Sequence, residues 1–133
     1  MRVVKLSTLP QETKNEVVKK QVLDMFRTKE GFSIGKDLNE PKSGYMVGGF
    51  GFHEVVNSEV DRKNLKTYIS EVMEFLNNQK NDLFFGGWYN ENNNTFELEI
   101  SINFKDKDSA ILTGQNFNEF AIWDIDNSKE IKL

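Results

Sequence analysis

The clearest pattern along the chain is a strict alternation of apolar and polar residues over 95–104, TFELEISINF. Such an alternation places every second side chain on the same face of a β-strand. One face would hold Phe96, Leu98, Ile100, Ile102 and Phe104, and the other Thr95, Glu97, Glu99, Ser101 and Asn103. A strand with one buried face and one hydrated face is typical of antiparallel sheets.

Two longer segments repeat their apolar residues at helical spacing. The first predicts a helix over about 10–29 that begins near Thr8 and Pro10 and stops at Gly31. Its buried stripe would consist of Val18, Val22, Met25 and Phe26. The second predicts a helix over about 59–79, with a stripe made of Leu65, Ile69, Val72 and Leu76.

Shorter apolar runs predict the remaining elements. Strands are expected at 2–6, 44–57, 83–90, 119–125 and 129–133, and a short helix within 105–117, capped by Asp106 or Asp108. Residues 31–43 combine Gly, Asn, Asp and Pro and are expected to form a loop. The resulting order, β-α-β-α-β-β-α-β, predicts an α+β fold in a single domain (1–133). Its mainly antiparallel sheet would have four or five strands, with helices on one face.

The segment 44–57, GYMVGGFGFHEVVN, is rich in glycine. It lacks the third glycine of a dinucleotide-binding motif and the Lys-Ser/Thr of a phosphate-binding loop, so we interpret it as a strand. Alternation would place Tyr45 and His53 on one face and Phe52 and Glu54 on the other. A Gly-Gly pair among aromatic residues recurs at 83–89, LFFGGWY. The repetition suggests two strands that lie close together, with rings crossing over the glycines of the neighbour.

Composition and charge exclude several classes of function. The chain has 133 residues and no cysteine, so it has neither a disulfide framework nor thiolate chemistry. No signal peptide is evident, and no apolar run approaches the roughly 18 residues of a membrane span, so we expect a soluble intracellular protein. The formal charge is −4, with +3 over residues 1–30 and −6 over 82–133. Nucleic-acid binders usually carry a basic stripe instead, so we expect no direct nucleic-acid partner.

His53, the only histidine, is the first candidate for chemistry. It would act as a general base only with a carboxylate from elsewhere in the fold, because its neighbour Glu54 would point to the opposite face. Glu97, Glu99 and Asp124 are the candidate partners. The simpler interpretation is that these are polar side chains on hydrated strand faces. No metal site and no cofactor are predicted.

Aromatic residues are the second candidate. Tyr45, Trp88 and Tyr89 would anchor a protein interface if they are exposed, whereas buried rings would belong to the core. The predicted binding residues are therefore Tyr45, His53, Trp88, Tyr89, Glu97 and Glu99.

The C-terminal half carries a resemblance. Gly86-Gly87-Trp88, a hairpin, the alternating strand, a short helix and the closing AIWDIDNSKEI resemble small proteins of bacterial phages and integrative elements. The resemblance covers about the last 50 residues, and Phe120 departs from the polar residue usual before AIWD. It implies a mobile element in a bacterium, and hence a bacterial cytoplasm. It implies no reaction and no catalytic residues.

Three functions follow as hypotheses. The first is a non-enzymatic binding protein that inhibits a host protein, for instance a nucleic-acid-guided defence nuclease, in an anti-CRISPR-like manner. The second is a small enzyme or ligand-binding domain that uses His53 and a strand carboxylate in a cleft between the two Gly-Gly strands. The third is a phage structural or assembly accessory, which would self-associate; a monomer and a homodimer both remain open.

Overall fold

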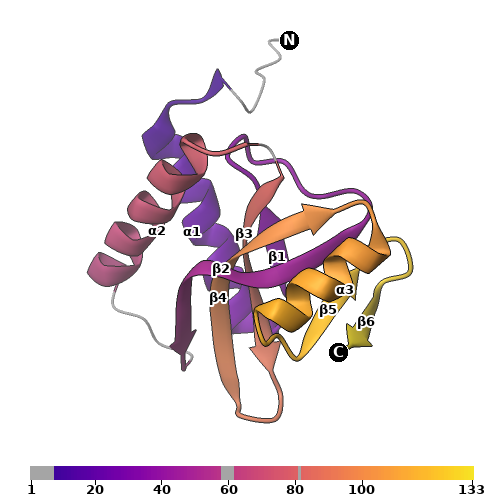
Figure 1. Cartoon of the computed structure of the whole chain (residues 1–133). Coiled ribbons are helices and arrows are strands. Elements are labelled where there is room, and N and C mark those ends of the chain that lie inside the picture. Colours follow the sequence, from indigo (N-terminus) through magenta and orange to yellow (C-terminus); the bar gives the residue numbers. More distant parts are fainter. Residues whose placement is uncertain (1–7, 58–61, 81) are drawn as a thin grey trace.

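The computed structural model describes residues 8–57, 62–80 and 82–133. All the strands in this part of the chain belong to one antiparallel sheet (Figure 1). Its strands are β1 (Phe32–Ile34), β2 (Tyr45–Val56), β3 (Leu83–Asn90), β4 (Thr95–Phe104), β5 (Ala121–Asp124) and β6 (Lys129–Lys132). They lie side by side in the order β1-β3-β4-β2-β5-β6. The helices are α1 (Gln11–Thr28), α2 (Arg62–Asn77) and α3 (Lys107–Asn116).

The predicted α+β class is confirmed, but the number of strands is not. The described residues form six strands rather than four or five. The additional strand β1 lies within the expected loop 31–43, where it pairs with Phe85–Gly87 of β3. The strand predicted at 2–6 lies outside the described residues. The strands predicted at 83–90 and 95–104 have the expected bounds.

The helix ends differ in detail from the expected ones. Pro10 is the residue that precedes α1, and Lys29 ends this helix in the left-handed conformation (φ 63°). The predicted bounds of about 10–29 agree with α1 to within one residue, while the left-handed turn that ends the helix lies at Lys29 and not at Gly31. Asp106 caps α3 as predicted, since its side chain accepts the backbone N–H of Ser109 at 2.9 Å.

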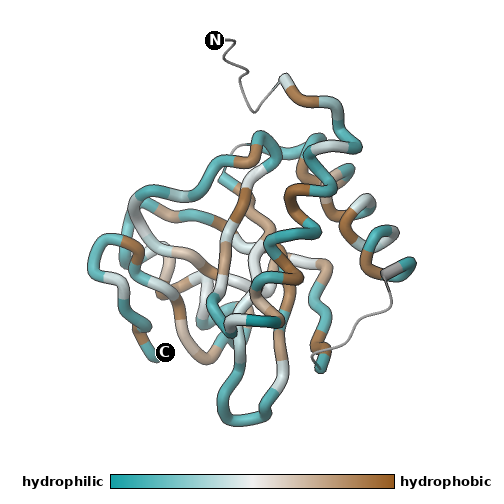
Figure 2. Tube along the Cα trace, turned by 180° about the vertical axis from the view of Figure 1, so that it is seen from behind, coloured by the Kyte–Doolittle hydropathy of each residue, from teal (hydrophilic) through white to brown (hydrophobic). Residues whose placement is uncertain are grey.

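The larger core lies between α1, α2 and the strands β3 and β4. Both predicted helical stripes pack in it, with Phe26 only partly buried. The apolar face of β4 contributes Phe96, Leu98 and Ile100, whereas Phe104 packs against a smaller core. The largest fully buried side chain of the larger core is Phe85, whose ring meets Phe32 and Tyr68 edge to face. Figure 2 shows apolar and polar positions alternating along the helices, while the turn between β3 and β4 is hydrophilic. None of the described helices is long and apolar enough to cross a bilayer.

A second, smaller core forms near the other end of the sheet. Val47 of β2, Ala110 of α3 and Ile122 of β5 make its buried centre. In Figure 1, α3 accordingly lies over β2 and β5, away from the pair formed by α1 and α2. Between the two cores, β2 passes through a segment that carries polar side chains.

The two Gly-Gly strands are not neighbours. β4 pairs with both β2 and β3 and therefore separates them. The prediction that they lie close together was wrong, and so was the proposed cleft between them. Gly87 instead makes room for α1 and β1, since a Cβ there would stand 2.7 Å from Sδ of Met25 and 2.9 Å from the Phe32 ring.

Candidate functional site

A bulged segment of β2 forms part of a polar surface on the sheet. From Val47 to Glu54 the strand advances seven residues, while β4 opposite advances only four, from Ile102 to Leu98. Extra residues of this kind bend a strand and redirect its side chains. Glycine allows the bend, because Gly49 has a φ of 86° and Gly51 a φ of 156°.

The extra residues change which face each side chain occupies. Because their number is odd, the alternation that starts at Tyr45 is reversed before His53. Tyr45 therefore does not share a face with His53, and the prediction that it would was wrong. Beyond the bulge the predicted alternation holds again. Val55 pairs with Glu97 on the polar face, and Glu54 pairs with Leu98 on the apolar face.

His53 lies against Glu97. Its Nε2 is 2.9 Å from Oε1 of Glu97, whose other oxygen accepts from Nδ2 of Asn90 at 2.9 Å. The histidine side chain is 48% exposed, and the glutamate side chain is 16% exposed. His53 thus has the carboxylate partner that the acid–base hypothesis required, and the partner is one of the two strand glutamates named for it.

Glu99 meets a second carboxylate that the sequence did not suggest. Its Oε2 accepts the backbone N–H of Gly49 at 3.0 Å. A Cβ at Gly48 would collide with the carboxylate of Glu99 and stand 2.7 Å from Oε1 of Glu119. The two carboxylates therefore occupy the space that a side chain at position 48 would fill.

Burial raises the pKa of both carboxylates of this pair. Burial is the larger cause that raises the pKa of Glu99 to about 7, and the charge of Glu119 adds to it. The Gly49 N–H and His53 act in the opposite direction. The pKa of Glu119 is also raised, mainly by burial. Among the ion pairs formed between described residues, none brings a lysine or arginine to Glu99 or Glu119.

Exposed aromatic rings border the same surface. Trp88 of β3 pairs with Glu97 in the sheet register, so the two side chains share a face, and Trp88 is 41% exposed. Phe50, in the bulge, is 40% exposed and its ring lies 6.5 Å from that of Phe117. We call the surface formed by His53, Trp88, Glu97, Glu99 and Glu119 the carboxylate face.

Three predicted residues lie elsewhere. Tyr45 packs against the smaller core. Tyr89 packs against the larger core, where its hydroxyl donates to Asn94 and Lys29 stands over its ring. Asp124 is buried and accepts from the backbone and side chain of Asn127, which lowers its pKa. It stabilises the turn before β6 and is not bonded to His53.

Glu119 and Asn90 are the residues that sequence reasoning missed. Glu119 follows α3, and its backbone N–H donates to the carbonyl of Gly114 at 2.8 Å, which fixes the loop against the helix end. Asn118 before it has a φ of 56°, and asparagine is one of the few residues that tolerate this conformation. An asparagine at the end of a predicted helix was therefore the one available signal of a sharp turn there.

Two grooves of the described surface lie away from the carboxylate face. One groove is lined by α1 and residues 30–32, and another of about 480 Å³ lies between β2 and α2. Neither is lined by His53, Glu97, Glu99 or Glu119. Within the described ranges no three His, Asp, Glu or Cys side chains are arranged to hold a metal ion.

Comparison with known proteins adds no relative: no family model, no curated protein and no solved structure matches the chain.

Proposed function

We propose that the chain is a small non-enzymatic binding protein, from a phage or mobile element, that docks its carboxylate face on a basic surface of a host protein. The observation that carries the proposal is the convergence of Glu99 and Glu119 above Gly48, where no lysine or arginine of the described chain forms an ion pair with either carboxylate. Glu97, Trp88 and Phe50 extend this surface over the sheet. Its acidic and aromatic character matches what an arginine- or lysine-bearing surface would recognise.

Charge narrows the choice of partner. Two copies related by a twofold axis through this face would bring their carboxylates together, which costs free energy. A nucleic acid would meet the same repulsion from its phosphates. A basic protein surface is the remaining complement, and the aromatic Trp88 would anchor it.

A nucleic-acid-guided defence nuclease is our candidate target, because its nucleic-acid channel is basic. At −4 the whole chain is too weakly charged to imitate a nucleic acid over its full length. The contact would therefore be local, centred on the carboxylate face. Binding in such a channel predicts competition with the nucleic acid that normally occupies it.

The test is capture from a bacterial lysate with matched variants. The double variant Glu97→Gln/Glu99→Gln and the single variant Trp88→Ala alter the face. Glu12→Gln/Glu74→Gln removes the same number of charges from exposed positions of α1 and α2, and Trp123→Ala removes a similarly exposed ring (45%) from β5.

We expect one basic protein to bind the wild type and both controls in a fixed ratio. The face variants should bind it at least about tenfold more weakly, a loss of roughly 1.4 kcal/mol or more. Added nucleic acid should compete with the wild-type chain and release the captured protein from it. Capture that is lost equally in the controls, or that nucleic acid does not affect, contradicts the proposal.

The contact between His53 and Glu97 favours a second candidate, a small enzyme. A carboxylate that orients an imidazole is a recurring acid–base arrangement, and 2.9 Å is within hydrogen-bond reach. Glu99 would then be the protonated group beside the base. This candidate predicts turnover of a substrate that His53→Gln abolishes and Glu74→Gln leaves unchanged. A small-molecule screen in which no turnover depends on His53 argues against it.

The assembly hypothesis has weaker structural support. β6 is an outer strand of the sheet and carries Lys129 and Lys132, and edge lysines discourage pairing with another sheet edge.

A further inference from the structure

We infer that Tyr68 of α2 is the positioning residue of the carboxylate face: its hydroxyl holds Phe52 in the conformation that turns His53 onto Glu97. The inference extends the proposed function, because it explains how the face is assembled and which helix controls it. It names a residue on the opposite side of β2 from the carboxylates.

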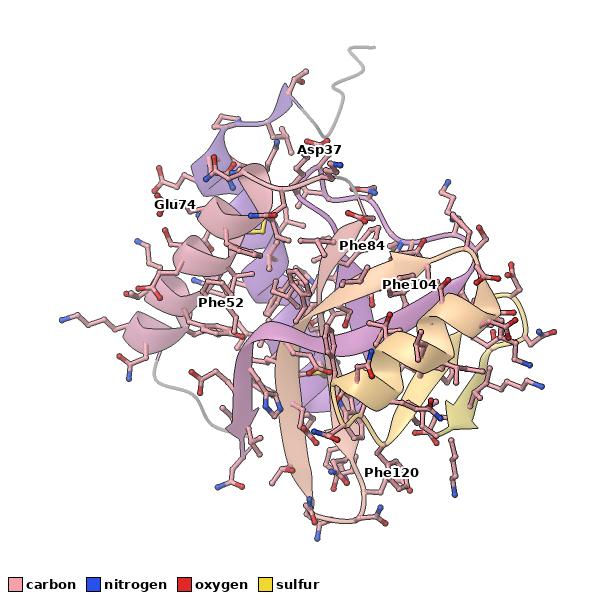
Figure 3. The ribbon with its side chains drawn as sticks, in the orientation of Figure 1. Asp37, Phe52, Glu74, Phe84, Phe104 and Phe120 are labelled. Atoms are coloured by element: carbon pink, nitrogen blue, oxygen red, sulfur yellow. The ribbon has the colours of Figure 1, made fainter. Side chains whose placement is uncertain are left out.

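The bond between α2 and the bulge is direct. The Tyr68 hydroxyl donates to the backbone carbonyl of Phe52, with 2.5 Å between the two oxygens. Phe52 has a φ of 53°, a left-handed conformation that is unfavourable for a large side chain. A conformation of this kind persists where the surroundings hold it. Here the hydroxyl holds the carbonyl of Phe52, and the ring of Phe75 packs 5.3 Å from that of Phe52. Figure 3 labels Phe52 on the side of β2 that faces α2.

The rest of the bulge cannot supply this restraint. Gly49 and Gly51 allow the bend without enforcing it, since glycine adopts many backbone conformations. β4 contributes no paired residue between Ile100 and Leu98, where the register shifts. His53 therefore takes its direction from the peptide unit of Phe52, and the Tyr68 hydroxyl is bonded to that unit.

Tyr68 itself is well placed to act as a fixed donor. Its ring packs edge to face on Phe85, at the centre of the larger core. Burial raises the pKa of Tyr68 far above the physiological range, and the charges of Glu54 and Glu99 act in the same direction. The hydroxyl therefore keeps its proton across the physiological pH range and remains able to donate to Phe52.

The chain offers a clean readout, because His53 is its only histidine and gives one set of imidazole NMR signals. Tyr68→Phe removes the hydroxyl and keeps the ring. Tyr89→Phe is the matched control, since it removes a tyrosine hydroxyl that bonds only Asn94 in the same hairpin. Glu97→Gln defines the signals of an imidazole that has lost its carboxylate.

We expect the imidazole signals of Tyr68→Phe to move from the wild-type positions to those of Glu97→Gln, while Tyr89→Phe keeps the wild-type positions. Wild-type signals in a folded Tyr68→Phe variant overturn the inference. A purely structural role for Tyr68 would lower the unfolding midpoint without moving these signals below the transition.

A second measurement covers the case in which Tyr68→Phe does not fold. In the wild type, the urea concentration is increased in steps that stay below the main unfolding transition. The NMR signals of the Tyr68 ring and of the His53 imidazole are recorded together at each step. Coupling predicts that both change at the same concentration, and a change of His53 with Tyr68 still in its native environment overturns the inference. No partner is present in either experiment, so the positioning role and the proposed binding function fail independently.

Discussion

The carboxylates of Glu99 and Glu119 meet above Gly48, although one belongs to β4 and the other to the loop after α3. Gly48 lies in β2, between the larger and the smaller core, so three separate segments contribute to one contact. The absence of a side chain at Gly48 makes the meeting possible. Burial of both acids in the same place gives the protein a group that titrates near neutral pH.

Glu99→Gln should stabilise the protein at high pH. The folded state holds the pKa of Glu99 at about 7, above its ordinary value of 4.5, so folding favours the protonated form. The contribution of Glu99 to the free energy of unfolding is therefore fully present below pH 4.5 and is lost as the pH rises through about 7. Glutamine keeps the oxygen that accepts from Gly49 and carries no charge.

We expect Glu99→Gln to exceed the wild type in unfolding free energy at pH 8 by about 1–3 kcal/mol, with a much smaller difference at pH 4. Urea denaturation at the two pH values measures this. Glu74→Gln, on the surface of α2, controls for the loss of one negative charge. An equal pH dependence in both variants would falsify the assignment of the effect to the buried pair.

Gly48→Ala should disturb the carboxylate pair rather than the core. The new Cβ would collide with the Glu99 carboxylate and stand 2.7 Å from Oε1 of Glu119, both of which are the ends of flexible side chains. We expect a loss of about 1 kcal/mol and a Glu99 pKa that falls toward its ordinary value as the carboxylate moves into water.

A double variant tests whether the collision with the Glu99 carboxylate causes the loss of stability in Gly48→Ala. Gly48→Ala should cost less in a Glu99→Ala background, because one of the two colliding groups is gone. Glu99 titration is followed by carboxyl carbon NMR and stability by urea denaturation. Equal costs in the two backgrounds would show that the backbone, and not the carboxylate, resists the methyl group.

Two glycines outside the face should respond differently to the same substitution. Gly87→Ala places a Cβ against Met25, Leu98 and the Phe32 ring, all at 2.7–2.9 Å in the larger core. Gly114→Ala lies in α3, where alanine favours the helix by about 1 kcal/mol, and its closest contact is the side-chain end of Leu133 at 2.6 Å.

We expect Gly87→Ala to lower the unfolding free energy by about 1–3 kcal/mol and Gly114→Ala to change it by less than about 1 kcal/mol. Thermal and urea denaturation compare the two. A Gly87→Ala variant as stable as the wild type would mean that β1 and α1 do not close over β3 as the structure places them.

The sequence predicted those elements whose side chains alternate without interruption. In β4 the period of two continues from Thr95 to Phe104, so its bounds and its two faces followed from the pattern alone. The placement of His53 and Glu54 on opposite faces also agreed with simple alternation, because both residues lie beyond the bulge.

The bulge itself could not be derived from the pattern. Its glycines indicated an irregular backbone conformation but not the number of extra residues. That number decides whether Tyr45 shares a face with His53. Glu119 was missed for a related reason. It lies 20 positions from Glu99 in the sequence, and only the packing of α3 on β2 and β5 brings it to Gly48.

Asn118 allows a test of how the loop presents Glu119. Its φ of 56° is tolerated by asparagine and glycine but is unfavourable for β-branched residues. Asn118→Gly should therefore change the unfolding free energy by only a few tenths of a kcal/mol, while Asn118→Val should lower it by about 1–2 kcal/mol. The valine variant should also lower the pKa of Glu99, because the nearby Glu119 charge raises it in the wild type and a distorted loop moves that charge away. Urea denaturation and carboxyl NMR on the two variants measure both effects. A valine variant that retains wild-type stability and a Glu99 pKa of about 7 would show that the left-handed turn at Asn118 does not determine where Glu119 lies.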